Sequence, residues 1–543
     1  MNGYDMIVAV TQNNINAHFK FLYGAKDGIQ PTIKIYDESN EEGIDATIEP
    51  PRIHLNVKRE PTKAIFQLTL RKGTLKYWQG RGKNAELNSL SILNWVLGFK
   101  VDLNLRDMDV KEIPKAIQEK IKPHTPKGEI DPSIFSVRQL FMNFQNAFLT
   151  ELDSSATSFP PEVADPKTSH ELANQDIEDA LFNFLKKYIK SLKTNGHNIL
   201  GYSIHTKNPN AIKKIDPTFP PTNVTYTTNP FQPDGKHNSD FSSYEPGLDT
   251  LNYLMMTGHR DWPSPNSVET RWFGNWVTSK DEYGVIAIAK HLFIDGFLLP
   301  KLIKTTTLKP YYEFINFEDG TYKPKICFEE NFDSYKSDPH NFGVYNYHHE
   351  FSKTFDYYGP LWTEEHTWKT TTDSKVEIPA GGNVINISGN CVLRFDCVHW
   401  HGAKNAALWT PSWQESKVRW EFTIRLSGAP DGVLMVDITP KQEDFVQYIK
   451  HNITVERGGD WWYKLGEMFK DIFDILHELR EKMGLYNDLI DAFNVLYDLP
   501  TQICEQINQT DKFIFLGGQS FQIYNPRFNN ELDLIANIKY QFD

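Results

Sequence analysis

Apolar residues near the start of the chain change from a strand-like to a helical pattern. Met6–Val10 is a short apolar run of the kind that forms a buried strand. Directly after it, Ile15, Phe19 and Leu22 recur at helical spacing within Asn13–Tyr23. The pattern therefore predicts a strand that leads into a helix.

Between Ile33 and Leu105 the apolar residues recur with period two. The alternation is clearest over residues 99–105, where apolar positions are separated by Lys100, Asp102 and Asn104. Successive side chains of a strand point to opposite faces of a sheet, so this pattern is typical of an antiparallel sheet with one face toward water. We expect this region to be sheet.

Asp176–Lys193 carries an apolar stripe at helical spacing, with acidic residues at its start and lysines at its end. Acids at the first turn and bases at the last complement the helix dipole, which favours an ordinary helix whose stripe packs in the core. The alternative is a helix that lies on an anionic membrane with its lysine end down.

The second half of the chain predicts a similar construction. Ile215–Gly247 is rich in proline and poor in core-forming residues, and we place the main boundary there, between a unit of residues 1–245 and a unit of residues 246–543. Val285–Leu302 repeats the apolar strand and helix of the N-terminus. Alternating segments over residues 375–439 predict more antiparallel sheet, so the chain is expected to hold two similar β-rich units.

A long helix is expected near residues 461–499. Apolar residues recur every three to four positions from Trp461 until Pro500 ends the pattern. Such a face packs against sheet and can border a hydrophobic groove for an apolar ligand. The candidate groove residues are Leu465, Met468, Phe469, Ile472, Leu476 and Leu479.

Composition and charge exclude several classes of protein. The 543 residues are 40% hydrophobic and 13% aromatic, which argues for a folded protein. A formal net charge of −13 repels polyanions, so nucleic-acid binding is not expected. Apolar runs are too short for a transmembrane segment, and the N-terminus lacks the basic start of a classical signal peptide. Four cysteines without a C-x-x-C pair fit synthesis and residence in a reducing cytoplasm.

Motifs that carry catalysis are scarce. The sequence has no G-x-S-x-G, H-E-x-x-H or Walker A motif. Cys397, His399 and His401 alternate along a predicted strand, and this geometry suits a zinc site with a further ligand from His348, His349 or His366. Isolated histidine pairs are more often structural, so we expect no cofactor and no enzyme, and keep a metal-dependent enzyme at this strand as the alternative.

Several segments resemble the accessory proteins of clostridial neurotoxin gene clusters, namely the forty-seven-kilodalton protein and its OrfX relatives. The resemblance lies in the order of these segments along the chain: Tyr4–Ala9, Phe135–Leu140, Ile199–Ile204, Leu251–Met256, Gly284–Ile288, Phe513–Phe521 and Asn525–Tyr540. It implies an α+β fold of the TULIP-like type, in which long helices are wrapped by strongly curved antiparallel sheets. It also implies binding of lipid or another hydrophobic ligand, and it supplies no catalytic residues.

Together these patterns predict a non-enzymatic protein that binds lipid or another apolar ligand in a hydrophobic groove. The resemblance adds a protein toxin or sister accessory proteins as expected partners, within a toxin complex or released together with a toxin. Peripheral contact with a membrane is compatible with this reading, and a transmembrane segment is not.

Overall fold

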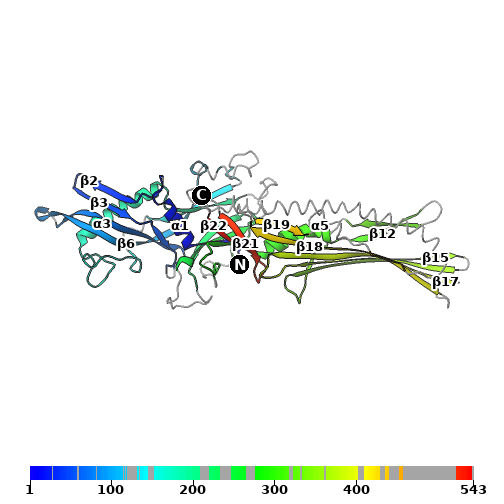
Figure 1. Cartoon of the computed structure of the whole chain (residues 1–543). Helices are drawn as coiled ribbons and strands as arrows, with labels where there is room; N and C mark the ends of the chain where they lie inside the picture. Colours follow the sequence, from blue (N-terminus) through cyan, green and yellow to red (C-terminus); the bar gives the residue numbers. More distant parts are fainter. Residues whose placement is uncertain are drawn as a thin grey trace.

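The computed structural model is an elongated assembly of antiparallel sheets with few helices (Figure 1). It describes residues 1–26, 28–57, 60–80, 82–113, 115, 118, 131–133, 135–144, 152–207, 219, 221–232, 246–263, 275–307, 309–316, 322–329, 333–359, 362–401, 409–428, 434–439, 452–455 and 521–540. Within these residues, no helix combines the length and the apolar character needed to cross a membrane.

A six-stranded sheet occupies the middle of the molecule. Its strands lie in the order β21 (Phe521–Phe528), β22 (Leu534–Tyr540), β11 (Gly284–Ile288), β1 (Met6–Thr11), β10 (Thr250–Thr257) and β9 (Pro221–Asn229). All of its pairings are antiparallel. Strands β1, β10 and β11 are buried along their whole length, which explains their continuous apolar runs.

A seven-stranded sheet built from the N-terminal part of the chain lies at one end. Its strands are β2 (Thr32–Asp37), β3 (Glu42–Ile48), β5 (Lys63–Gln79), β6 (Glu86–Asp107), β7 (Phe135–Asn143) and β8 (Ile199–Thr206), with β4 (Arg52–His54) paired to β5. Two helices accompany it: α1 (Gln12–Leu22) and α3 (Gln175–Thr194). The predicted alternating region and both predicted helices are thereby confirmed.

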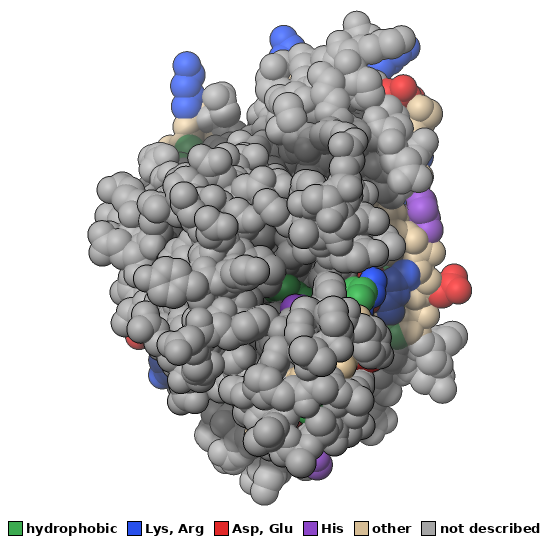
Figure 2. Space-filling view, turned by 90° about the vertical axis from the view of Figure 1, so that its right-hand side faces the viewer, with side chains coloured by type: hydrophobic (Ala, Val, Ile, Leu, Met, Phe, Trp, Pro, Cys, Tyr) green, Lys and Arg blue, Asp and Glu red, His purple; other side chains and the backbone are tan. Residues whose placement is uncertain are grey.

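A second seven-stranded sheet forms the opposite end (Figure 1). Its strands are β14 (Lys336–Ser337), β15 (Val344–Gly359), β16 (Trp362–Glu377), β17 (Val384–His401), β18 (Trp409–Gly428) and β19 (Leu434–Thr439), with β20 (Asn452–Val455) paired to β18. Figure 2 looks onto this end, and the coloured side chains along its right-hand side include basic, acidic and histidine residues.

Shorter elements complete the described chain. They are the hairpin β12 (Pro310–Asn316) with β13 (Tyr322–Phe328), the π-helix η7 (His291–Leu298), the helix α5 (Leu299–Thr306) and the 3-10 turns η1 (Gly82–Asn84), η2 (Val110–Glu112) and η6 (Pro246–Leu248). The strand and helix predicted at Val285–Leu302 are β11 followed by η7 and α5.

The proline-rich segment expected to be a boundary loop contains a strand. Strand β9 runs from Pro221 to Asn229 and pairs with β10. Its threonines, Val224 and Tyr226 are β-favouring residues, and they outweigh the prolines, which flank the strand or stand at its first position. The division at residues 245 and 246 falls between these two paired strands and stays a prediction, as does the similarity of the two units.

The described part of the chain fits the TULIP-like architecture that the resemblance implies. It consists mostly of antiparallel sheets, one of which curls into a half-barrel, and it contains few helices. The expected long helix of residues 461–499 lies outside the described residues.

Candidate apolar ligand site

Helix α1 is held in a fixed orientation by polar side chains along one of its faces. Its N-cap Thr11 accepts a hydrogen bond from the Asn14 backbone N–H at 3.2 Å. The Gln12 side chain accepts from the Leu55 backbone N–H at 2.8 Å, and the Asn16 side chain accepts from the Ile53 backbone N–H at 2.7 Å. The bonds to Leu55 and Ile53 attach the helix to the β4 segment.

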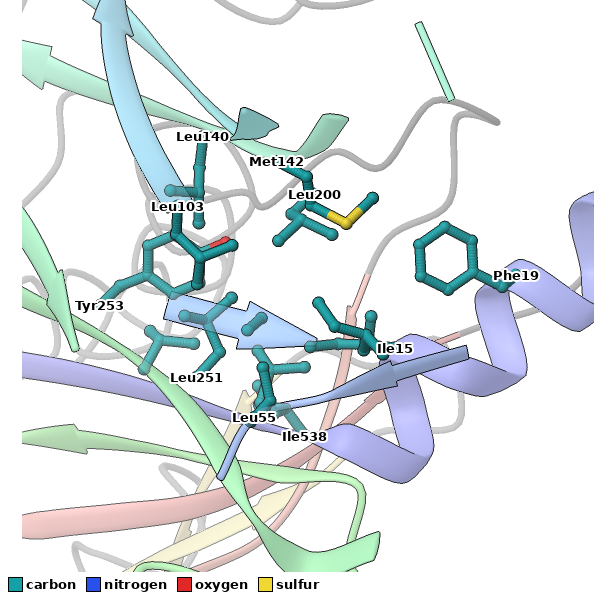
Figure 3. Close-up of a cluster of buried hydrophobic side chains, with 14 of the residues drawn as sticks. Ile15, Phe19, Leu55, Leu103, Leu140, Met142, Leu200, Leu251, Tyr253 and Ile538 are labelled. Atoms are coloured by element: carbon teal, nitrogen blue, oxygen red, sulfur yellow. The ribbon is translucent and has the colours of Figure 1, made fainter. Parts of the chain in front are cut away.

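The buried apolar side chains of α1 belong to a larger apolar cluster, which we call the α1 cluster. It comprises Ile15, Phe19, Leu55, Leu103, Leu140, Met142, Leu200, Leu251, Tyr253 and Ile538, all of them buried. In Figure 3 the side chains of β7 and β8 face those of α1 and β10. The cluster therefore lies where the N-terminal sheet meets the central sheet.

The α1 cluster is part of a larger apolar core. The same connected set of buried residues includes Phe66 and Trp95 of the N-terminal sheet, Ile286 of the central sheet, and Ile387 and Leu426 of the C-terminal sheet. Continuous apolar packing thus runs through all three large sheets. Burial of these side chains stabilises the fold by about 25 cal/mol per Å² of apolar surface removed from water.

Two tyrosines, Tyr226 and Tyr253, lie side by side near the α1 cluster. Tyr226 of β9 and Tyr253 of β10 are register partners, and the Tyr226 hydroxyl donates to the Leu103 carbonyl oxygen. Burial, with a smaller contribution from Asp102, raises the pKa of Tyr226 to about 12. Burial, and then the neighbouring Tyr226, raises the pKa of Tyr253. Both phenols are therefore neutral at physiological pH and add no charge to the site.

These shifts predict a loss of stability in alkali. An unfolded phenol ionises near pH 10, whereas folded Tyr226 keeps its proton until about pH 12, so stability is complete below pH 10 and falls as the pH rises from 10 to 12. We expect Tyr226→Phe combined with Tyr253→Phe to remove at least about 1 kcal/mol of this alkaline loss at pH 11. Unfolding midpoints between pH 8 and 11 measure it. Exposed Tyr36→Phe is the control, and an equal effect of that variant would contradict the prediction.

The site residues predicted from the sequence belong to the expected helix of residues 461–499. Leu465, Met468, Phe469, Ile472, Leu476 and Leu479 lie outside the described residues, so the groove at that helix stays a prediction.

The alternative metal site falls on β17. Positions 397, 399 and 401 alternate along this strand as expected, and the structure describes their backbone without their side chains. Over the described residues, no group of three or more His, Cys, Asp or Glu side chains is arranged to hold a metal ion. The metal-dependent enzyme stays an untested alternative.

A polar cluster that the sequence patterns did not reveal surrounds Asp5. This carboxylate is fully buried and accepts from the Thr257 backbone N–H and hydroxyl, both at 2.8 Å. Its other oxygen contacts the Arg260 guanidinium and lies 2.9 Å from the His291 Nε2 atom. The cluster ties the start of β1 to the end of β10 and to the first residue of the π-helix η7. An acid directly before an apolar strand is the only sequence signal that points to it.

Comparison with known proteins gives solved structures of low similarity. The crystal structure of P47 of Clostridium botulinum E1 matches over 99% of both chains, with 11% identity and a TM-score of 0.40. The crystal structure of a lipopolysaccharide binding protein matches over 99% of both chains, with 9% identity and a TM-score of 0.29. No protein-family model matches the chain, and no curated protein does. Since both TM-scores are below 0.5, the fold class rests on the described sheets alone.

Proposed function

We propose that the protein is non-enzymatic and binds an apolar ligand, a lipid acyl chain or similar hydrocarbon, in its interior. The observation that supports this is the apolar core that continues from beneath α1 through all three large sheets. Each buried methylene of a ligand contributes about 0.8 kcal/mol, so hydrocarbon is held there without a charged anchor. Candidate contacts are the α1 cluster and the predicted helix face at residues 465–479.

The first test is the content of the purified protein. Native mass spectrometry followed by organic extraction is expected to release lipid in stoichiometric amount. A fluorescent fatty acid is expected to bind to the delipidated chain. If the protein carries no extractable lipid and takes up no probe, the proposed function is wrong even if the fold is correct.

A matched pair of variants locates the ligand. Leu200→Phe enlarges a side chain of the α1 cluster, and Leu426→Phe makes the same change at an equally buried position of β18. Overpacking costs each variant about 1–3 kcal/mol of stability, but only Leu200→Phe is expected to weaken probe binding, by about tenfold or more. Equal binding by the two variants would exclude the α1 cluster as the site.

The groove predicted at the helix of residues 461–499 is tested separately. Met468→Trp combined with Ile472→Phe fills that face, and loss of uptake in this variant alone assigns the ligand there. Stoichiometric zinc that disappears with His399→Ala and His401→Ala, together with an activity, would favour the metal-dependent enzyme instead.

The proposed setting of this binding is a protein toxin complex. A protein toxin or sister accessory proteins are the proposed partners, and this part of the proposal rests on the sequence resemblance alone. Co-purification tests this part of the proposal. We expect the chain to co-purify with such partners, and we expect the complex to persist after the lipid is removed.

A further inference from the structure

One face of the N-terminal sheet carries a group of exposed apolar side chains. Tyr36 is 57% exposed, Leu93 59%, Trp78 39% and Leu87 37%. The strand register places all four on the same face. On β5 and β6, Trp78 lies opposite Leu87, and Lys72 lies opposite Leu93. Tyr36 of β2 lies opposite Gly43 of β3, which lies opposite Lys76 of β5, two residues from Trp78. We call this surface the distal outer face.

The aromatic rings of the distal outer face are held in place by their surroundings. The Trp78 indole N–H donates to the Asn40 carbonyl oxygen at 2.7 Å. The Tyr36 ring lies against Gly43, where a Cβ atom would come within 2.7 Å of it. Rings that are already fixed lose little conformational entropy on binding, so this face is preorganised for contact with a partner surface.

The rest of this sheet already has its covering elements. On its inner face, α3 is attached through the Gly80 backbone N–H, which donates to the Asp176 carboxylate at 3.0 Å. Nearer the central sheet, residues 152–158 pair with the edge of β6 through backbone hydrogen bonds between Val96 and Ser158 at 2.9 Å. Ala156 of this segment lies over the outer side of Gly98, where a Cβ atom would come within 2.6 Å of it. The distal outer face lies beyond that cover, which is why its apolar side chains reach solvent.

The charge of this face is opposite to that of the chain. Lys34, Lys72 and Lys76 share the face with Asp45, which pairs with Lys34 at 3.4 Å. Within the described chain, Lys72 and Lys76 take part in no ion pair. A chain with a formal net charge of −13 thus presents two uncompensated cations among exposed apolar rings.

We propose that the distal outer face docks on the surface of an anionic lipid bilayer. Tryptophan and tyrosine favour the interfacial region of a bilayer, where their apolar rings and polar atoms are both accommodated. Lysines reach the headgroups while their alkyl stems cover apolar surface, and anionic lipids attract them electrostatically. This contact is separate from the interior ligand and does not depend on it.

Vesicle flotation tests the proposal on the full chain. We expect the protein to float with vesicles of phosphatidylcholine containing 30% phosphatidylserine, to float much less with phosphatidylcholine alone, and to be released by high salt. Lys72→Glu combined with Lys76→Glu is expected to weaken binding at least tenfold, and Tyr36→Ser combined with Leu93→Ser to weaken it several-fold.

The control carries the same charge change on another exposed surface. Lys190→Glu combined with Lys193→Glu alters the solvent side of α3 and is expected to bind like the unmodified chain. Three results overturn the proposal: no flotation with either vesicle, equal loss in the α3 control, or a chain dimer in sedimentation that Tyr36→Ser with Leu93→Ser dissolves. The last result would assign the face to a second copy of the chain.

Discussion

Replacing Asp5 with asparagine is expected to destabilise the protein by about 3 kcal/mol. The buried carboxylate accepts hydrogen bonds from the Thr257 backbone N–H and hydroxyl, contacts the Arg260 guanidinium, which is also a donor, and lies beside the His291 ring. Asparagine turns one of the two acceptors into a donor, so buried donors are left facing each other. The midpoint of chemical or thermal unfolding measures the change.

Asp295→Asn is the matched control for this substitution. Asp295 is exposed and pairs with Lys290 at 2.9 Å. An exposed ion pair contributes at most about 1 kcal/mol. If both variants unfold at the same midpoint, the Asp5 cluster does not hold β1, β10 and η7 together as the geometry indicates.

Trp95→Ala is expected to cost about 3–5 kcal/mol. Trp95 is among the largest fully buried side chains and meets the Phe159 ring edge-on at a centroid distance of 5.7 Å. Truncation leaves a cavity that the surrounding sheet fills only in part. Thermal unfolding of the variant is the measurement, and the N-terminal sheet is expected to melt first.

Trp78→Ala provides the comparison, because it removes the same side chain from the exposed side of the same sheet. We expect it to cost less than about 1 kcal/mol. Similar losses in the two variants would mean that burial does not decide the contribution of these tryptophans.

Local patterns predicted several of the individual elements. The helix expected at Asn13–Tyr23 is α1 at Gln12–Leu22, and the helix expected at Asp176–Lys193 is α3 at Gln175–Thr194. Helical and alternating periods arise from burial of one face, and both can be recognised within a short window of residues. The same reasoning predicted sheet over residues 33–105 and 375–439, where β2 to β6 and β17 to β19 lie.

Long-range pairing could not be predicted in this way. The Asp5 carboxylate meets Thr257 across 252 positions of the chain, and no spacing or period encodes such a contact. The apolar runs of β1, β10 and β11 look alike in the sequence, so their order in the central sheet is decided by packing. Strand β9 was missed because its prolines hid a β-favouring composition.

The strand order of the central sheet also governs when this part of the molecule can form during synthesis. Strand β1 leaves the ribosome early, but its neighbours β10 and β11 follow about 240 to 280 residues later, and β22 follows near residue 540. The strands β2 to β8 have their partners within the first 206 residues and can pair first. An apolar β1 therefore stays unpaired and prone to association until about half of the chain has been made.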